Sequence, residues 1–475
     1  ITSDHAIFAS VGSVSDLTID ESCTFAATKA GFLAALAAES TGTFTNVVNK
    51  ANVSVVIAGA GDATVAVGGL VAVGESKMDG CKNYGNVTYT AGASYGALVG
   101  GLAGYNNGAM NKCENHGNVT MSVESLSAYG VVKSIDNLPI HIGGLAAQLG
   151  ANAPVTESVN RGTVDYDITK VENLAVSCGT NRPRMGGIVG LTQSSITSST
   201  NEGIVDVNVV TSDRSIFSGK NYPINVGGIS GGAPVDASGA SGADITSCTN
   251  SGAITCVTYC KGTIPTCGGI VAHPGYEDAT QTNTITRCEN TGSISATTFT
   301  IARVGGISGG SGSVTYCKNT GTIDGHLSIE DGNIGGIIGW LDKGHKFEYN
   351  ESYCTLSNTR APGTKGTSEV GGLIGQHGNY DSCPGEGRGC KVRCDISYDY
   401  SNEKWYGMLL GYFWSTHTVV LGTEDEPIIV LGGSMTYSGG TTQITAENYT
   451  KYTNHSSAGG NSGSKPFTVH VKFGE

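Results

Sequence analysis

Two aspartates, Asp165 and Asp206, have the residue type and the spacing for acid–base chemistry. Each follows a valine at the same place in neighbouring copies of a sequence repeat, so their carboxylates would stack about 5 Å apart. Retaining glycosidases use two carboxylates at about that separation. Other copies of the repeat carry Thr, Ser or Asp at this position, and a solvated outward position explains the pair more simply. We therefore expect no catalytic residue and no enzyme.

Five of the 14 cysteines recur at one position of the repeat and alternate there with Ser158 and Ser199. We interpret them as small inward residues that form a buried column of thiols. Side chains stacked in register point the same way, which does not bring Cβ atoms to the roughly 3.8 Å that a disulfide requires. The five are Cys81, Cys113, Cys248, Cys288 and Cys317.

Six other cysteines fall outside this register, in two groups of three that we place in two loops. Each group could hold one loop disulfide. Zinc is the alternative, but the spacings lack a CxxC pair and neither group has a convincing local fourth ligand. We expect no metal site and no cofactor. The groups are Cys256, Cys260 and Cys267, and Cys383, Cys390 and Cys394.

Asn-x-Ser/Thr sequons offer possible glycosylation sites in a eukaryotic secretory pathway. The alternative is that Thr and Ser abound in such strands, which makes chance sequons common. Three sequons fall at the same place in successive repeats, and three more lie later in the chain. They begin at Asn52, Asn86, Asn118, Asn350, Asn448 and Asn454.

A short pattern recurs seven times: Cys or Ser, any residue, Asn, any residue, Gly, any residue, Val or Ile. It alternates with a second pattern, Gly-Gly followed by Leu or Ile. Consecutive copies of the second pattern are 30 to 43 residues apart, by subtraction of their positions. A period of 20–50 residues indicates a solenoid or an array.

The apolar positions of each repeat alternate with period two between Gly and Asn, which favours strands over helices. We predict an all-β fold, a β-solenoid (β-helix) of about ten or eleven coils with Asn and Cys ladders, plus a small C-terminal β segment. We expect the glycine two residues after each ladder Asn to supply the positive φ of a corner. The amide ladder comprises Asn49, Asn83, Asn115, Asn160, Asn201, Asn250, Asn290 and Asn319.

The predicted organisation has three parts. Residues 1–30 form an N-terminal strand or cap region. Residues 31–423 form the repeat body, whose last coils become irregular from about residue 354, where Leu356 replaces the expected Asn. Residues 424–475 form a C-terminal β segment with a Gly/Ser linker and a terminal strand.

Composition excludes several classes of partner. The net charge is −13 and no basic cluster occurs that would release counterions from a phosphate backbone, so we expect no nucleic acid. No run of 18 apolar residues occurs, so we expect no transmembrane helix. The chain opens with ITSDHAIFAS, which fits a processed product, and we expect it to be secreted, extracellular, at a cell surface.

The repeats resemble the GLUG-type repeat of bacterial cell-surface, adhesin-like proteins. The pattern Asn-x-Gly-x-Val followed by Gly-Gly-Leu-Val-Gly is matched by VGGLAG and GGIVG, and the similarity covers roughly residues 31–375. The resemblance implies an exported, adhesive or surface role and supplies no catalytic residues. The tail GGTTQITAENYTKYTNHSS also resembles a segment that closes such repeat regions in exported proteins of Gram-negative gut bacteria.

The leading hypothesis is an extracellular structural or adhesive surface protein, and the subunit of a filament is one form that this role can take. Its partners would be other copies of itself, or a surface glycan or protein ligand. The alternative is a carbohydrate-active β-helix enzyme, a glycoside hydrolase or polysaccharide lyase. A groove with converging aromatic and carboxylate residues would favour the enzyme, and smooth Thr/Ser-rich faces would favour the scaffold.

Two further features bear on partners. The longest insertions, residues 120–141, 165–185 and 206–226, should emerge along one edge, because insertions are tolerated where they do not interrupt the core. The C-terminal run Pro466–Glu475 alternates apolar and polar residues as a half-buried strand and follows a Gly/Ser-rich stretch. It should cap its own solenoid or, alternatively, add to a neighbouring molecule.

Overall fold

The computed structural model describes most of the chain, and it confirms the predicted all-β solenoid. The described residues are 1–58, 65–92, 96–124, 140–168, 183–209, 224–233, 243–258, 265–273, 284–298, 302–310, 312–327, 332–359, 368–378, 380–398, 406–413, 417–437, 440–454 and 467–474. Contacts divide the chain into two compact units: residues 1–236 with 248–263 form unit 1, and residues 237–247 with 264–475 form unit 2.

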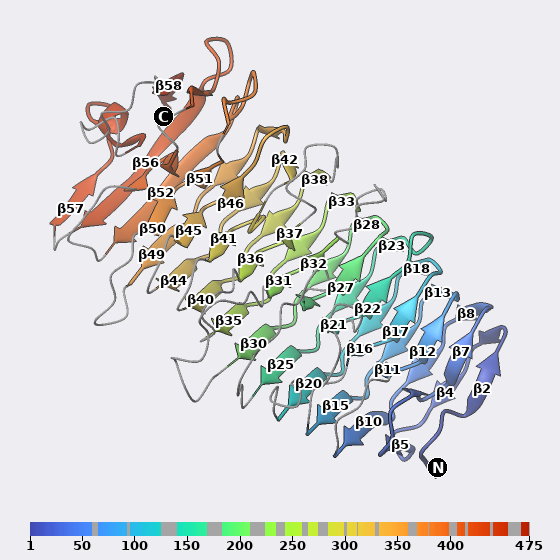
Figure 1. The fold of residues 1–475 in the computed structure, drawn as a ribbon. Coiled ribbons are helices and arrows are strands. Elements are labelled where there is room, and N and C mark those ends of the chain that lie inside the picture. Colours follow the sequence, from blue (N-terminus) through green and yellow to red (C-terminus); the bar gives the residue numbers. More distant parts are fainter. Residues whose placement is uncertain are drawn as a thin grey trace. The chain divides into compact units, whose positions relative to one another are not determined.

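Unit 1 consists of five ladders of parallel strands, and each coil contributes one strand to a ladder (Figure 1). The β6 ladder contains the residues that precede each Gly-Gly-(Leu/Ile) pattern, and the β2 ladder contains those that follow it. The β6 ladder is β6 (Phe32–Ala34), β11 (Val65–Gly68), β16 (Ala97–Gly100), β21 (Ile140–Gly143), β26 (Arg184–Gly186) and β31 (Asn225–Gly227). The β2 ladder is β2 (Phe8–Val11), β7 (Ala37–Ser40), β12 (Val71–Gly74), β17 (Ala103–Asn106), β22 (Ala146–Leu149), β27 (Val189–Thr192) and β32 (Ser230–Gly232).

The other three ladders of unit 1 carry the rest of each coil. The β3 ladder is β3 (Val14–Ser15), β8 (Thr43–Thr45), β13 (Lys77–Asp79), β18 (Met110–Asn111), β23 (Val155–Thr156) and β28 (Ile196–Thr197). The β4 ladder is β4 (Thr18–Ile19), β9 (Val48–Asn49), β14 (Lys82–Asn83), β19 (Glu114–Asn115), β24 (Val159–Asn160), β29 (Thr200–Asn201) and β34 (Thr249–Asn250). The β1 ladder is β1 (Thr2–Ser3), β5 (Thr24–Ala27), β10 (Asn52–Ile57), β15 (Val87–Ala91), β20 (Val119–Val123), β25 (Val164–Ile168), β30 (Val205–Val209) and β35 (Ile254–Thr258).

Unit 2 repeats this construction. Its strands that precede the Gly-Gly pattern are β36 (Thr266–Gly268), β41 (Arg303–Gly305), β45 (Gly332–Gly335), β50 (Ser368–Gly371) and β53 (Tyr406–Gly407). Those that follow it are β37 (Val271–His273), β46 (Ile338–Leu341), β51 (Ile374–His377) and β54 (Leu410–Tyr412). Next come β33 (Ile245–Thr246), β38 (Thr284–Thr286), β42 (Ser313–Thr315) and β47 (Phe347–Glu348). The last pair of ladders holds β39 (Glu289–Asn290), β43 (Lys318–Asn319) and β48 (Glu351–Ser352), with β40 (Ile294–Thr298), β44 (Ile323–Leu327) and β49 (Thr355–Asn358).

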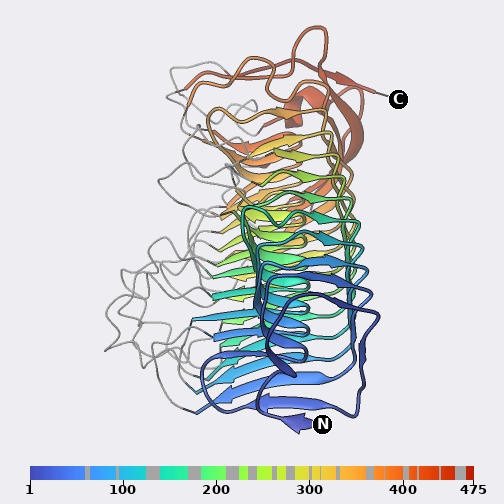
Figure 2. The same cartoon turned by 90° about the vertical axis from the view of Figure 1, so that its right-hand side faces the viewer.

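The number of coils agrees with the prediction. Among the described residues, six strands of unit 1 and five of unit 2 precede a Gly-Gly pattern or its variant, which makes eleven coils in addition to a first coil, β2 to β5, that lacks such a strand. Figure 2 shows successive strands of each unit lying above one another. Residues 1–30, for which we expected an N-terminal strand or cap region, form β1 to β5, and β2 to β5 pair with the next coil in parallel register.

The coils change at the C-terminal part of unit 2, close to where the repeat pattern fades. There β52 (Lys391–Tyr398) runs alongside both β48 and β49, and β56 (Ile428–Tyr437) pairs with β52. The described residues 440–454 and 467–474 then pack onto this unit. They form β57 (Gly440–Gln443), the 3₁₀ helix η3 (Tyr449–Tyr452), β58 (Phe467–Val469) and β59 (Val471–Phe473).

The terminal strand segments pair within their own chain, as the preferred capping hypothesis requires. β58 pairs with β55 (Val419–Leu421), and β59 pairs with β56. The Gly/Ser-rich residues 456–465 lie outside the described residues. No helix in the described part of the chain is long and apolar enough to span a membrane.

Candidate functional site

The predicted amide ladder is present and fully buried. In unit 1 the Nδ2 atom of each ladder asparagine donates to Oδ1 of the next, from Asn49 through to Asn250, over 2.8 to 2.9 Å. In unit 2, Asn290 donates in the same way to Asn319 at 2.8 Å. Each of these donor amides also donates to the backbone carbonyl two residues later, such as Gly117 O for Asn115 at 2.7 Å. These bonds join the coils from Asn49 to Asn250, and the two coils of Asn290 and Asn319, at one corner.

The expected role of the glycines was wrong. Gly85, Gly117 and their equivalents are not among the residues with positive φ. They are needed because the coils approach closely: a Cβ on Gly117 would lie 2.0 Å from the carbonyl oxygen of Gly85. The corner is turned instead by the residue just before the Cys or Ser, for example Lys112 (φ 49°) and Glu157 (φ 48°).

The second glycine of each Gly-Gly pair has a related role. A Cβ on Gly101 would lie 2.0 Å from Gly144 O and 2.5 Å from the side chain of Asn115. A Cβ on Gly144 would meet Gly187 O at 2.1 Å and the Asn160 side chain at 2.3 Å. The Gly-Gly pattern and the Asn pattern therefore contact each other in the fold. The absence of a side chain on the second glycine leaves space for the ladder asparagine.

The five repeat cysteines are buried, as expected, and each donates its thiol to a backbone carbonyl of the preceding coil. Cys113 Sγ, for example, lies 3.5 Å from Met78 O, and Cys317 Sγ lies 3.4 Å from Ile285 O. Ser158 and Ser199 occupy the same column in other coils and accept backbone N–H groups with their hydroxyls.

The off-register cysteines do not lie as the loop disulfide hypothesis expected. Cys256 is a buried residue inside β35, and Cys267 is a buried residue inside β36, so neither lies in a loop. Cys390 and Cys394 are also buried, and these two are free thiols; Cys383 is free and half-buried. Cys394 Sγ lies 3.4 Å from Sγ of Cys354, which lies between β48 and β49 and belongs to neither group. Cys260 lies outside the described residues. No cluster that could hold a metal ion occurs among the described residues.

The sequons fall into two structural groups. Asn52, Asn86 and Asn118 are exposed and form an outer ladder, in which the side-chain oxygen of each accepts a backbone N–H from the next coil. Asn350 and Asn454 are fully buried, so a glycan cannot reach them in this fold. Asn448 is half-buried and bonds to its own turn. The outer ladder was missed in the sequence, although its constant spacing signals it.

Asp165 and Asp206 are direct partners in the β25–β30 register, so the structure brings this pair together. Burial and the nearby charge of Asp206 raise the pKa of Asp165 to about 6. Burial and Asp167 also raise the pKa of Asp206. Both side chains are half-buried on the outward face of flat parallel strands. The same outward position carries Thr88, Thr120, Thr255 and Ser295 in other coils.

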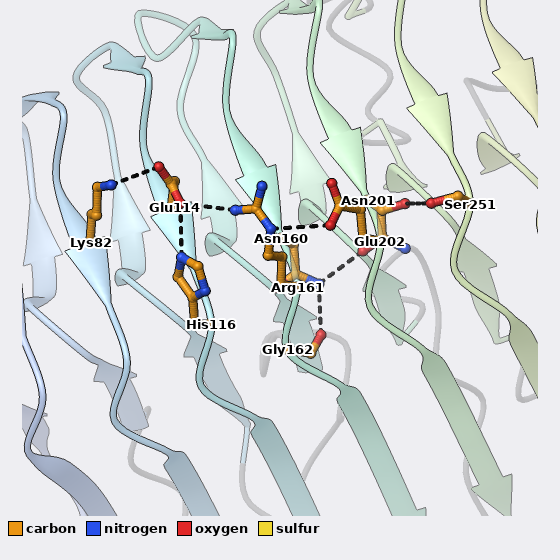
Figure 3. Close-up of polar contacts among 9 residues, drawn as sticks. All are labelled: Lys82, Glu114, His116, Asn160, Arg161, Gly162, Asn201, Glu202 and Ser251. Atoms are coloured by element: carbon orange, nitrogen blue, oxygen red, sulfur yellow. Dashed lines mark hydrogen bonds and ion pairs between the residues drawn. The ribbon is translucent and has the colours of Figure 1, made fainter.

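A row of charged side chains runs across the outward face of the β4 ladder in unit 1 (Figure 3). We define the charged row as Lys82, Glu114, His116, Arg161 and Glu202. Because the ladder asparagines point inward, the residues on either side of each one point outward.

Glu114 is the centre of the charged row. Its carboxylate lies 2.8 Å from Lys82 Nζ, 2.8 Å from His116 Nε2 and 2.9 Å from Arg161 Nη1. The Arg161 guanidinium also reaches Glu202, at 3.1 Å. The hydrogen bond from Lys82 and the neighbouring cations hold the pKa of Glu114 below its usual value. The row thus ties four coils together at the surface and presents both signs of charge.

An aromatic platform adjoins this row. Tyr84 is 45 % exposed, and its ring stacks on the His116 imidazole with centroids 4.4 Å apart. Aromatic faces beside charged groups that donate and accept hydrogen bonds are suited to binding polar ligands. None of these residues was singled out in the sequence, because outward positions vary from coil to coil.

Unit 2 contains a cavity of about 270 Å³ beside the Gly-rich turn at residues 384–389. Two carboxylates line it, Glu348 and Glu386. Each is already paired: Glu348 with Arg388, and Glu386 with the buried His377 at 3.1 Å and with the Tyr380 hydroxyl at 3.2 Å. These pairs hold the turn against the coil.

Several predicted features fall on residues outside the described ranges. The insertions at 120–141, 165–185 and 206–226 lie mostly there, so their predicted common edge stays a prediction. In comparisons with known proteins, no protein family, no curated protein and no solved structure matches the chain.

Proposed function

We propose that the protein is an extracellular structural and adhesive surface protein, whose outward strand faces bind a surface glycan or protein. The observation that carries the proposal is the regular stack itself. Asn side chains lock each described coil to the next without interruption from Asn49 to Asn250, which gives a rigid body for presenting a surface.

The outward faces support the scaffold over the enzyme. Along the β1 ladder the outward side chains are short and mostly Thr, Ser, Asp or Asn, and no aromatic side chain of these described strands lies on that face; Tyr89 and Tyr166 are fully buried. The resemblance to GLUG-type surface proteins points the same way. The charged row and Tyr84 place polar and aromatic groups side by side on the surface of unit 1, where a ligand can contact them.

Binding of the full chain to arrays of glycans and of extracellular matrix proteins tests the proposal. We expect at least one ligand to be retained, with about tenfold weaker binding for a Tyr84→Ala, Arg161→Ala double variant. A matched Tyr316→Ala, Arg287→Ala variant in unit 2 controls for general loss of an exposed tyrosine and arginine. Release of sugar fragments from a polysaccharide by the purified chain would instead support the carbohydrate-active enzyme.

A further inference from the structure

The first coil of unit 1 leaves a space for one strand beside β6. Strands inside the β6 ladder pair on both edges, whereas β6 pairs only with β11 among the described residues. The chain does not supply the missing neighbour, because residues 1–7 run from β1 beside β5 across to β2.

This space is a cavity of about 240 Å³, which we call the β6 slot. Its walls are the edge of β6 and the turn that enters it, with the crossover residues Asp4 and His5 on the other side. Phe32, which lines the slot, is 43 % exposed. Three other apolar residues near the start of the chain are also exposed: Phe8 is 42 % exposed, Ile7 40 % and Ile1 69 %. An unpaired edge with exposed apolar residues is a template for another strand.

The C-terminal strand of this chain has the sequence that the β6 slot requires. Strands of the β6 ladder follow the pattern apolar, any residue, apolar, Gly, as in Val65–Gly68 and Ile140–Gly143. The final position is a glycine in the other described strands of the ladder and Ala34 in β6, and a Cβ on Gly68 would lie 2.0 Å from Val71 O. Val471, Lys472, Phe473 and Gly474 repeat this pattern.

The register of the ladder assigns each residue a partner. β6 pairs with β11 so that Phe32, Leu33 and Ala34 lie opposite Ala66, Val67 and Gly68. A strand on the other edge in the same register places Phe473 beside Leu33, in the inward column. It places Lys472 beside Phe32, at the position that His141 and Arg184 hold in other coils.

Charge and burial also favour this occupant. Residues 1–34 contain four carboxylates, Asp4, Asp16, Asp20 and Glu21, and one lysine, Lys29. The strand from Phe467 to Gly474 contains Lys472 and His470 and no carboxylate. In its own-chain position its apolar residues are only half-buried, whereas strands inside the β6 ladder are fully buried.

We propose that the C-terminal strand of a second copy of this chain inserts into the β6 slot, parallel to β6. The own-chain pairing with β55 and β56 is then the closed form, and exchange of the strand between copies links subunits end to end. This inference rests on the proposed structural role. The partner is a second copy of the protein, and the two copies contact each other at the β6 slot.

The test compares the mass of full-length chains in solution, by size exclusion with light scattering, across three variants. A chain that ends at residue 463 keeps the slot and lacks the strand. Phe32→Asp keeps the strand and puts a charge in the slot. Val56→Asp changes a similarly exposed apolar residue of unit 1, 50 % exposed, and serves as the control.

We expect concentration-dependent assembly for the wild type and for Val56→Asp, and its loss in the first two variants. Mixing those two variants should give one-to-one dimers and nothing larger, because each pair has one usable slot and one usable strand. Assembly of the shortened chain at the wild-type level would overturn the proposal.

A peptide of residues 466–475 tests the slot directly. It should bind the shortened chain at least tenfold more tightly than the same peptide with Lys472→Glu, and Phe32→Asp in the shortened chain should abolish binding.

If the shortened chain does not fold, full-length Lys472→Glu should assemble at least tenfold more weakly than the control Lys451→Glu. Equal behaviour in either comparison would contradict strand exchange. Ligand binding by the charged row is measured separately, so either result can fail without the other.

Discussion

The Nδ2 atom of Asn160 donates to Oδ1 of Asn201 at 2.9 Å, although 41 residues separate the two in the sequence. The same amide donates to Gly162 O at 2.8 Å. Both asparagines are completely buried. The amide of each ladder residue therefore supplies hydrogen-bond partners both to the next asparagine and to its own backbone.

Replacing Asn160 or Asn201 by Leu should lower the free energy of unfolding by about 1–3 kcal/mol for each hydrogen-bonding group left without a partner in the core. Equilibrium denaturation of the purified chain measures this. The matched control is Asn152→Leu, which changes an exposed asparagine in a turn of the same unit. An unchanged stability of both ladder variants would contradict a stabilising ladder.

The glycines that accommodate the close approach of coils provide a second test. Gly117→Ala puts a methyl group about 2.0 Å from Gly85 O, which the stack relieves only by separating two coils. We expect a loss of about 1–3 kcal/mol, as for overpacked cores. Gly12→Ala should have little effect, because no atom lies within 4 Å of the position that its Cβ would take. A stability change of equal size in both variants would argue against a steric role.

The repeats revealed the coils, their number and the buried asparagine ladder, because every copy carries the same residues at the same spacing. The corner conformation could not be found in this way. The residues with positive φ at that corner include Asn46, Lys112, Glu157 and Tyr316, which share no side-chain property. The fold imposes the positive φ at this corner whichever residue stands there. The sequence therefore carries no residue type that would mark the corner.

The candidate surface was harder to predict than the core for a related reason. Inward side chains must pack against the coils above and below. Lys82, Glu114 and Arg161 lie on the surface and need only pair with one another by opposite charge. The partners of Glu114 lie 32 and 47 residues away, and no pattern links them in a single sequence. Asp165 and Asp206 were recognised because they repeat in register.

The charged row should contribute modestly to stability, in a way that depends on salt. Glu114→Gln removes the charge that faces Lys82, His116 and Arg161, and exposed ion pairs contribute about 0.2–1 kcal/mol each. We expect a loss of about 1 kcal/mol at low ionic strength, and a smaller one in 1 M NaCl, where the screening length is about 3 Å.

Glu39→Gln is the matched control for this variant, since it neutralises an exposed glutamate of the same unit. Thermal unfolding at the two salt concentrations measures both variants. The same loss at low and high salt would show that packing, rather than charge, connects these side chains.

The stacked aspartates should make the fold less stable as the pH rises from about 4 to 6. Burial and then the charge of Asp206 raise the pKa of Asp165 from 3.8 to about 6, so the folded chain binds this proton more tightly than the unfolded chain. Stability therefore falls as the pH rises through this range, and the penalty is fully present above about pH 6. Because Asp165 is half-exposed, solvent screening reduces the effect to about 1 kcal/mol.

Asp165→Asn should remove this penalty. We expect the variant to be more stable than the wild type by about 1 kcal/mol at pH 7.5, with the difference shrinking to near zero at pH 4, where the wild-type carboxyl is protonated. Denaturation series at several pH values, with Asp4→Asn as the exposed control, measure the difference. A gain of the same size at pH 4 and pH 7.5 would show that the charge of Asp165 is not its cause.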